Sequence, residues 1–231
     1  MALAGGMTDT GAISGDATYT VPLQFWFCRN PGLALPLIAL QYHEVKVKFD
    51  YVATGWTNRP TTTFWCDYIY LDTDERRRFA QVSHEYLIEQ VQYETFGASG
   101  ATKDLNFNHP VKELIFTGTH TLATGAAALA STYQLKLNGH DRFAARNFRY
   151  FTRTQVWQHH TGYGGVTAND SIGVYSFALK PEEHQPSGTC NFSRIDNAQL
   201  VQGSAAAIEV YAVNYNVLRI MSGMGGLAYS N

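Results

Sequence analysis

Eight histidines in a chain of 231 residues are enough to build a metal centre or an acid–base site. His159 and His160 are adjacent, so on a strand they would point to opposite faces of a sheet and could not easily bind one metal ion. His43 and His84 are each followed by glutamate, but neither pair is completed to the HExxH pattern of zinc proteases. The spacing therefore favours ordinary strand and loop histidines, and we expect no metal site and no catalytic residue.

Carboxylates gather at two places. Asp72, Asp74 and Glu75 are candidates for an acid–base pair or an oxygen-ligand cation site. Three arginines follow at 76–78, within reach of one helical turn, so the pattern favours a solvated ion-pair network at the start of a short helix. Residues 181–184 (PEEH) could likewise be an acid–base or cation site or a solvated charged group. The Pro-Ser-Gly turn that follows them favours an exposed turn. Neither a GxSxG elbow nor a phosphate-binding glycine loop occurs, so we expect no enzyme and no cofactor.

The three cysteines, Cys28, Cys66 and Cys190, are odd in number, far apart and without a CxxC spacing. This is neither a disulfide framework nor a zinc-ligand pattern. We expect free thiols, buried or partly buried, in a reducing compartment.

An apolar run, VPLQFWFCRNPGLALPLIALQYHEVKV at 21–47, raises the question of membrane insertion. Its uninterrupted part, Gly32–Leu40, has nine residues, whereas a spanning helix needs about 20. Extending it would place Arg29 near the centre, where a charge is costly. Residues 1–20 lack the basic start and apolar block of a signal peptide. We therefore expect no membrane insertion, but a short apolar helix or tight loop over 31–40 that begins at the Asn30-Pro31 cap.

The composition points to a packed, sheet-rich protein. Hydrophobic residues make up 45% of the chain, aromatic residues 13% and charged residues 16%. The formal net charge of -2 provides no general attraction for nucleic acid, so direct nucleic-acid binding is not expected.

Several segments alternate between apolar and polar residues with a period of two, which predicts strands with one buried face. In the segment at 208–220, one face is expected to carry Tyr211, Val213, Tyr215 and Val217. The segment FWCDYIYL at 64–71 is apolar on nearly both faces, as in a strand covered on two sides. The only other helical pattern is the short one over Asp74–Val82. The alternating segments are HEVKVKFDYV (43–52), YLIEQVQYETF (86–96), VKELIFTG (111–118), TYQLKLNG (132–139), GVYSFALK (173–180) and IEVYAVNYNVLRI (208–220).

Many short strands separated by turns, with little helix, predict an all-β antiparallel sandwich or jelly roll. A weak internal sequence repeat supports two such units. An alternating strand and an aromatic strand precede the linker, and a similar order returns near the C-terminus. The two units would meet near residues 72–85, with the first much shorter than the second.

Longer strings carry a specific resemblance. They are VPLQFWFCRNPGLALPLIALQYHEV, YIYLDTDERRRFAQVSHEYLIEQVQ, LNGHDRF, QHHTGY and YSFALKPEEHQPSGTCNFSRIDNAQL. From about residue 20 to the C-terminus, the sequence resembles the major capsid proteins of nucleocytoplasmic large DNA viruses. The resemblance implies a double jelly roll, trimers of pseudo-hexagonal outline and assembly of those trimers into an icosahedral shell. It also implies location in the virion, assembly in the host cytoplasm, and contacts with itself and with minor capsid proteins.

Mapped onto this chain, the resemblance implies three parts: a flexible or non-native segment at 1–20, the later strands of a first jelly roll at 21–80, and a second jelly roll at 81–231. The first jelly roll would be incomplete, as in a partial gene or a reading that begins at an internal methionine. Within it we expect the apolar run to bury five side chains. Two alternatives stay open, a carbohydrate-binding module and a metal-dependent jelly-roll enzyme. The five side chains expected to be buried are Phe25, Phe27, Leu35, Leu37 and Ile38.

Overall fold

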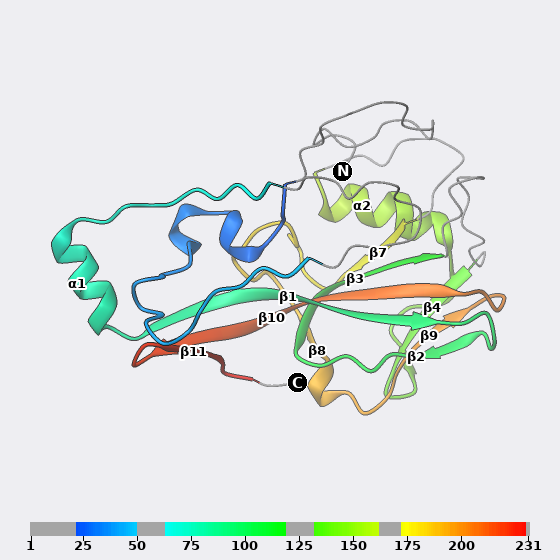
Figure 1. Ribbon diagram of the computed structural model, residues 1–231. Coiled ribbons are helices and arrows are strands. Elements are labelled where there is room, and N and C mark those ends of the chain that lie inside the picture. The colour runs from blue at the N-terminus through cyan, green and yellow to red at the C-terminus, as the bar shows by residue number, and fades with distance from the viewer. Residues whose placement is uncertain (1–21, 50–62, 119–131, 162–171, 230–231) are drawn as a thin grey trace, which may run out of the picture. The chain divides into compact units, whose positions relative to one another are not determined.

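The computed structural model describes residues 22–49, 63–118, 132–161 and 172–229 (Figure 1). The chain forms two compact units, which we call unit 1, centred on Leu87–Asn216, and unit 2, formed by Gln24–Tyr86 with Val217–Ala228. The described elements are η2 (Trp26–Cys28), η3 (Pro31–Leu33), α1 (Thr73–Gln81), β1 (His84–Phe96), β2 (Thr102–Asp104), β3 (Pro110–Gly118), β4 (Thr132–Leu137), β5 (His140–Asp141), β6 (Arg146–Asn147), η4 (Tyr150–Thr154), α2 (Gln155–His159), β7 (Ile172–Ser176), β8 (Cys190–Asn191), η5 (Phe192–Arg194), β9 (Ala198–Gln202), β10 (Ile208–Met221) and β11 (Met224–Leu227).

The strands of the described residues form two antiparallel sheets. One has the order β1-β10-β3-β7, with β11 added to β10 and β8 to β3; the other has the order β2-β9-β4-β5, with β6 added to β4. The chain crosses between the sheets at each step from β1 to β4, from β6 to β7 and from β8 to β10, as in a jelly roll (Figure 1). The strands β4 to β6 share one sheet, as do β7 and β8, and β10 and β11. The all-β, jelly-roll prediction is confirmed.

Alternation located β10 correctly, and Val213 and Tyr215 of the predicted face are buried, but Tyr211 is not. Among the first five residues of the strand, the buried ones are Ile208, Val210 and Ala212. Tyr211 instead packs against Tyr93, with ring centroids 4.8 Å apart and the rings tilted by 32°. A register shift between residues 213 and 214 interrupts the pairing of β10 with β3, and both faces are buried from there to residue 216. The bulge explains the error, because a strict two-residue period cannot cross an inserted residue.

Aromatic rings fill the space between the sheets of unit 1. The Phe116 ring lies 4.9 Å from Tyr133, 6.0 Å from Phe148 and 5.4 Å from Phe151. Gly173 on β7 faces the same rings, and an added Cβ there would lie 2.7 Å from Phe116. Each buried ring contributes roughly 1.5–3 kcal/mol through apolar burial. This core holds the two sheets together and so positions the segments that connect their strands.

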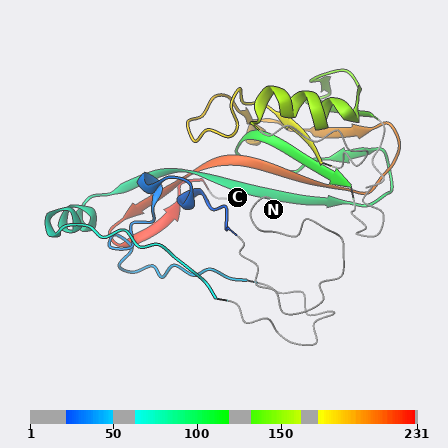
Figure 2. The same ribbon diagram turned by 90° about the horizontal axis from the view of Figure 1, so that it is seen from above.

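A helical stretch that the sequence did not indicate packs on β7. It consists of η4, a π-helical turn, and α2, and Figure 2 shows it lying across β7 and β3. Phe151 is fully buried, and the buried Gln155 accepts a hydrogen bond from the Ser176 backbone N–H at 3.1 Å. The helix thus covers part of β7, the outermost strand of its sheet.

In unit 2, α1 confirms the short helix predicted at 74–82. Asp72 is its N-cap and accepts a hydrogen bond from the Thr73 N–H at 2.7 Å. Asp74 and Glu75 lie in the first turn, where negative charge is favourable. None of the helical residues is buried, so packing within unit 2 contributes little to this helix.

The apolar run at 22–42 forms two short 3₁₀ turns and a loop. Asn30 caps η3 as predicted, accepting a hydrogen bond from the Gly32 N–H at 2.9 Å. The burial prediction was wrong for Phe25, which is 37% exposed, and for Leu37, which is 50% exposed. In the turn that follows η3, Pro36 and Ala39 point inward instead, and the Ala39 N–H bonds to the Pro36 carbonyl at 2.9 Å. A tight turn buries residues three apart, so the one after Pro36 faces outward.

Two predicted strands are extended chain without strand partners among the described residues. They are 43–49 and 63–72, and they meet where the Phe49 and Phe64 rings lie 5.9 Å apart. Residues 50–52 of the first prediction lie outside the described residues. The hairpin of β10 and β11 contacts the loop around Tyr42, whose backbone N–H donates a hydrogen bond to the Gly223 carbonyl at 2.9 Å.

Candidate assembly surfaces

The adjacent histidines lie at the end of a helix rather than on a strand. His159 is the last residue of α2 and His160 is its C-cap. His160 lies between two carboxylates, with Nε2 3.1 Å from Glu113 Oε2 and Nδ1 3.2 Å from Glu182 Oε1. His159 Nδ1 lies 3.1 Å from the Leu179 carbonyl. The two rings therefore have separate partners, and the strand placement from which the sequence argument started was wrong.

The two histidine–glutamate pairs also have structural partners. His84 Nε2 lies 2.8 Å from the Phe79 carbonyl and fastens the end of α1 to the start of β1. Glu85 forms a 2.7 Å ion pair with Arg219. His43 Nδ1 accepts a hydrogen bond from the Gly225 N–H at 2.8 Å. These contacts hold loops within unit 2.

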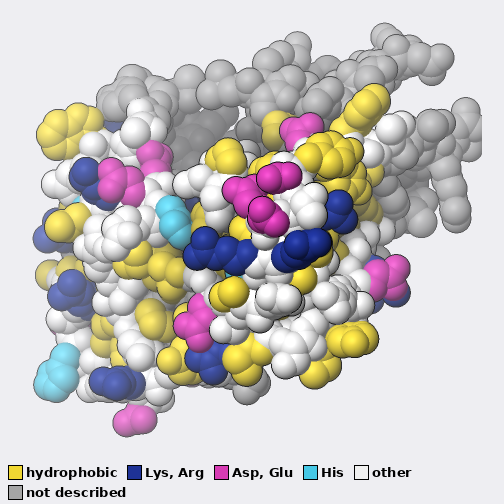
Figure 3. Space-filling model, turned by 90° about the vertical axis from the view of Figure 1, so that its left-hand side faces the viewer, with side chains coloured by type: hydrophobic (Ala, Val, Ile, Leu, Met, Phe, Trp, Pro, Cys, Tyr) yellow, Lys and Arg dark blue, Asp and Glu magenta, His cyan; other side chains and the backbone are white. Residues whose placement is uncertain are grey.

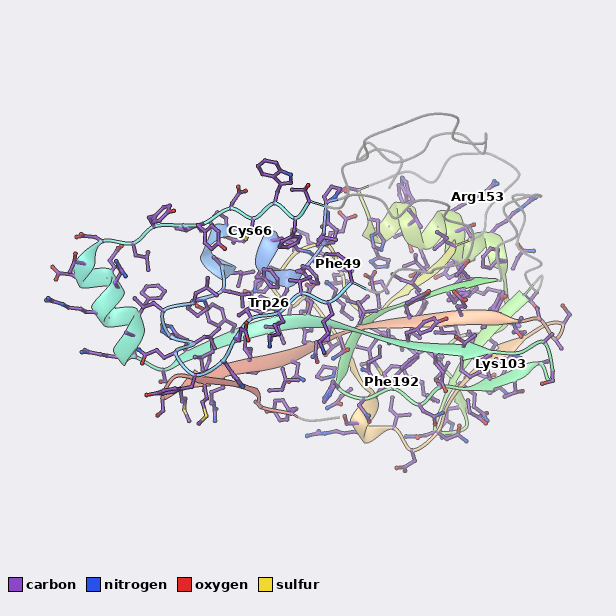
Figure 4. The ribbon with its side chains drawn as sticks, viewed as in Figure 1. Trp26, Phe49, Cys66, Lys103, Arg153 and Phe192 are labelled. Carbon is purple, nitrogen blue, oxygen red and sulfur yellow. The ribbon has the colours of Figure 1, made fainter. Side chains whose placement is uncertain are left out.

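Unit 1 buries two lysines, and both have defined partners. Lys112 Nζ lies 2.7 Å from Glu89 Oε1 and donates to the Pro181 carbonyl at 2.7 Å. Lys103 Nζ donates to the carbonyls of Gly97 and Ser99 at 2.6 and 2.8 Å, closing the turn between β1 and β2 (Figure 4). The PEEH segment is therefore not wholly exposed, because Pro181 is fully buried and anchors it. Both lysines hold turns in place.

The remaining chemical candidates are also explained by the fold. Asp74 lies 3.9 Å from Arg77, both side chains are largely exposed, and the acidic cluster is the solvated helix start that was predicted. The expectation that all thiols are buried or partly buried was wrong: Cys190 is half-buried, but Cys28 and Cys66 are exposed. Within the described ranges, no three His, Cys, Asp or Glu side chains are placed to hold a metal ion.

An open depression of about 410 Å³ lies beside β1 and is lined by residues 91–94, Asn106 and Phe107. Its polar side chains are already used, since both oxygens of Glu94 contact Asn106 at 3.1 Å and Gln92 bonds to the Asn108 backbone. These bonds tie β1 to the chain between β2 and β3. The depression therefore presents paired groups rather than a set of convergent free ones.

Among the described residues, none of the helices is both long enough and apolar enough to cross a bilayer.

Large apolar side chains are exposed along the extended segment 63–72 of unit 2. Trp65 is 88% exposed and Tyr70 is 92% exposed, and Phe64, Tyr68 and Ile69 are each more than half exposed. Side chains on both faces of this segment are exposed, so the prediction of a strand covered on two sides was wrong within the part of the chain that the structure describes. Soluble monomers rarely leave such adjacent apolar side chains in water unless the surface binds a partner.

The β10–β11 hairpin and α2 carry further exposed apolar groups. Met221 and Met224 on the hairpin are 50% and 57% exposed, and Trp157 on α2 is 72% exposed. Arg149 and Arg153 precede Trp157 on the same helical stretch at spacings of four residues, so they lie on one side of it. The sequence reading missed this surface because the arginines are spread out and the helix was not predicted.

Charges of both signs are mixed with hydrophobic groups on the face that carries α1 (Figure 3). This agrees with the small net charge and differs from the single-sign surface of a nucleic-acid-binding protein. The geometry thus favours surfaces for protein contact over a reaction site.

Comparison with known proteins gives matches along nearly the whole chain. Residues 75–226 match the model of the large eukaryotic DNA virus major capsid proteins, and residues 6–72 match that of the major capsid protein N-terminus. The chain is 51% identical over 96% of its length to a major capsid protein of Pyramimonas orientalis virus. It is 41% identical over 95% of its length to that of Paramecium bursaria Chlorella virus 1.

A solved structure described as a quasi-atomic model of the PBCV-1 virus capsid matches 96% of the chain and 74% of its own length, with a TM-score of 0.75 and 36% identity. The chain spans 63% of the Pyramimonas orientalis virus protein and 68% of the Paramecium bursaria Chlorella virus 1 protein. The second alignment extends over 301 residues, more than the 231 of this chain, so that relative has residues inside the match without a counterpart here.

Proposed function

Because this chain belongs to the family of large eukaryotic DNA virus major capsid proteins, we propose that it is a structural subunit of a virion shell. Its work is self-assembly: complementary surfaces of many copies are buried against one another, and no bond is made or broken. The observation that carries the proposal is the high identity to major capsid proteins over almost the whole chain, on a jelly-roll framework.

We further propose that copies associate as homotrimers of pseudo-hexagonal outline and that these trimers tile an icosahedral lattice. Closed three-fold symmetry repeats one subunit contact around a ring, so a modest contact is used three times. The exposed apolar side chains of segment 63–72 and of the β10–β11 hairpin support the proposal, because they require a covering partner. Minor capsid proteins would be further partners, and assembly would take place in the host cytoplasm.

For the domains, we propose that residues 21–80 belong to a first jelly roll, that 81–231 form the second, and that 1–20 precede both. The two family models adjoin between residues 72 and 75, which supports a division near α1. The strand order in β1 to β10 supports one jelly roll in the later part. The unpaired extended segments 43–49 and 63–72 fit strands whose jelly-roll neighbours come from elsewhere.

Light scattering coupled to size-exclusion chromatography tests the assembly proposal. The purified chain, loaded at increasing concentration, should elute with the mass of three chains and form larger species at the highest concentrations. A mass of one chain at every concentration would count against self-assembly.

A further inference from the structure

The surface segment Phe177–Gly188, between β7 and β8, is held by Lys112 of β3 at Pro181 and by the two histidines at the end of α2. His159 Nδ1 lies 3.1 Å from the Leu179 carbonyl, and a carbonyl only accepts, so this nitrogen carries a proton. His160 reaches Glu182 of the same segment and, on its other side, Glu113 of β3. The imidazole therefore links Glu182 to the sheet, in addition to the Lys112–Pro181 bond that anchors the same segment.

The partners of His160 differ in how much water reaches them. The Glu113 side chain is 9% exposed, that of His160 is 19% exposed, and that of Glu182 is 40% exposed. In the described part of the chain, Glu113 Oε2 and His160 Nε2 have no hydrogen-bond partner beyond the ion pair that they form. Glu182 has two more, since it accepts hydrogen bonds from the Thr161 N–H at 3.1 Å and from the Thr161 hydroxyl at 2.7 Å.

The protonation state of His160 decides how many carboxylates it can hold. The imidazolium has two N–H donors and can face both carboxylates, whereas neutral imidazole has one donor and one lone pair. The neutral ring keeps its one proton on the nitrogen whose hydrogen bond would be most costly to lose. That nitrogen is Nε2, because the buried Glu113 oxygen has no other hydrogen-bond donor among the described residues. The Nδ1 lone pair then faces the Glu182 carboxylate, and the two repel.

We propose that His160 is a pH-sensitive latch: protonated, it binds the Glu182 part of the segment Phe177–Gly188 to β3, and on losing its proton it releases Glu182, while Lys112 still anchors Pro181. Thr161 then holds Glu182 without the histidine, and it follows His160 directly at the end of α2. The latch acts on a surface loop of unit 1 and leaves the sheets unchanged.

The electrostatic surroundings support this assignment. Contact with Glu113 raises the pKa of His160 above its ordinary value, burial opposes the rise, and Glu182 adds to it. The pKa of Glu182 is lowered: burial opposes the change, but the hydrogen bonds from Thr161 and the contact with His160 outweigh it. The neighbouring lysines are engaged elsewhere, Lys112 with Glu89 and Lys180 with Glu183. From β3, the segment and α2, the charged groups facing the ring are thus the two carboxylates.

The direction of the effect follows from the raised pKa. Stabilisation of the segment is complete below the unfolded value of about 6.5 and is lost as pH rises through the higher folded value. The latch is therefore closed in mildly acidic solution and opens on the alkaline side of 6.5.

Hydrogen exchange of the full chain, followed by mass spectrometry and corrected for the intrinsic pH dependence, tests the latch. Between pH 5.5 and 8.5, protection of peptides covering residues 177–188 should fall by about tenfold for each unit by which folding raises the pKa. His160→Gln should make protection independent of pH, and Glu182→Gln should greatly reduce the dependence. His140→Gln, which removes an exposed histidine on β5, should behave as the unmodified chain.

NMR titration gives an independent readout. The imidazole signal that disappears in His160→Gln should titrate with a midpoint above 6.5. A midpoint at or below 6.5, or pH-dependent protection that persists unchanged in both the His160→Gln and Glu182→Gln variants, would overturn the latch. Glu182 is partly exposed, so its glutamine variant should fold even if His160→Gln does not.

Discussion

The buried ion pair between Lys112 and Glu89 gives the sharpest test of how unit 1 is held together. Their side chains are 2% and 6% exposed, the charged atoms lie 2.7 Å apart, and Nζ also donates to the Pro181 carbonyl. The ammonium lies 5.6 Å from the Tyr215 ring. Lys112→Met keeps most of the chain volume but removes the charge and the donors.

The expected loss in the free energy of unfolding is large because the Glu89 carboxylate stays buried after Lys112 is replaced. Removing one partner of a buried pair costs about 3–5 kcal/mol, since the remaining charge is no longer compensated. For a domain of this size, 1 kcal/mol shifts the melting temperature by about 2–4 °C, so a fall of roughly 10 °C is expected. The double variant Lys112→Met/Glu89→Leu should recover much of the loss, because no uncompensated charge remains.

Thermal unfolding followed by circular dichroism, with urea unfolding as a second measure, reports the change. Lys180→Met is the matched control: Lys180 pairs with Glu183 at 3.0 Å, but the side chains are 68% and 56% exposed, and such pairs contribute about 0–1 kcal/mol. The reasoning fails if Lys112→Met is no more destabilising than Lys180→Met.

Three further variants probe other parts of the chain. Gly173→Ala should lower the urea midpoint by the equivalent of about 1–3 kcal/mol, because the added methyl meets two core phenylalanine rings, whereas Gly97→Ala has open space; equal midpoints would contradict this packing. Ala39→Asp should unfold unit 2 at lower temperature, while Leu37→Asp should have little effect, since these residues are 4% and 50% exposed; the reverse order would contradict the turn geometry. Trp65→Ser should leave the melting temperature nearly unchanged but weaken self-association in light scattering; undiminished association would exclude Trp65 from the interface.

The sequence predicted those elements whose signals are local. Two-residue alternation located β1, β3, β4 and β10, and Asn138-Gly139 supplies the turn after β4, with positive φ at both residues. The capped, acidic start of α1 was equally readable. These signals depend only on neighbours along the chain, so no tertiary information was needed.

Other features depend on contacts that local patterns do not encode. The stretch of η4 and α2 buries polar Gln155 beside Phe151, so it lacks a simple apolar stripe. Segments 43–49 and 63–72 have strand-like sequences, but a strand requires a hydrogen-bonding neighbour, and no described residue supplies one.

The cluster around His160 could not be found from spacing. Its two carboxylates are 47 residues before the histidine and 22 residues after it, and they converge only because β3 and the segment after β7 pack beside the end of α2. The resemblance to capsid proteins, by contrast, was carried by long strings and required no geometry.

Electron microscopy of the purified chain tests the central claim most directly. Particles at moderate concentration should show three-fold symmetry with a pseudo-hexagonal outline, and concentrated samples should form sheets or shells of such particles. Single-chain particles that never associate would contradict the proposal that this protein is a shell subunit.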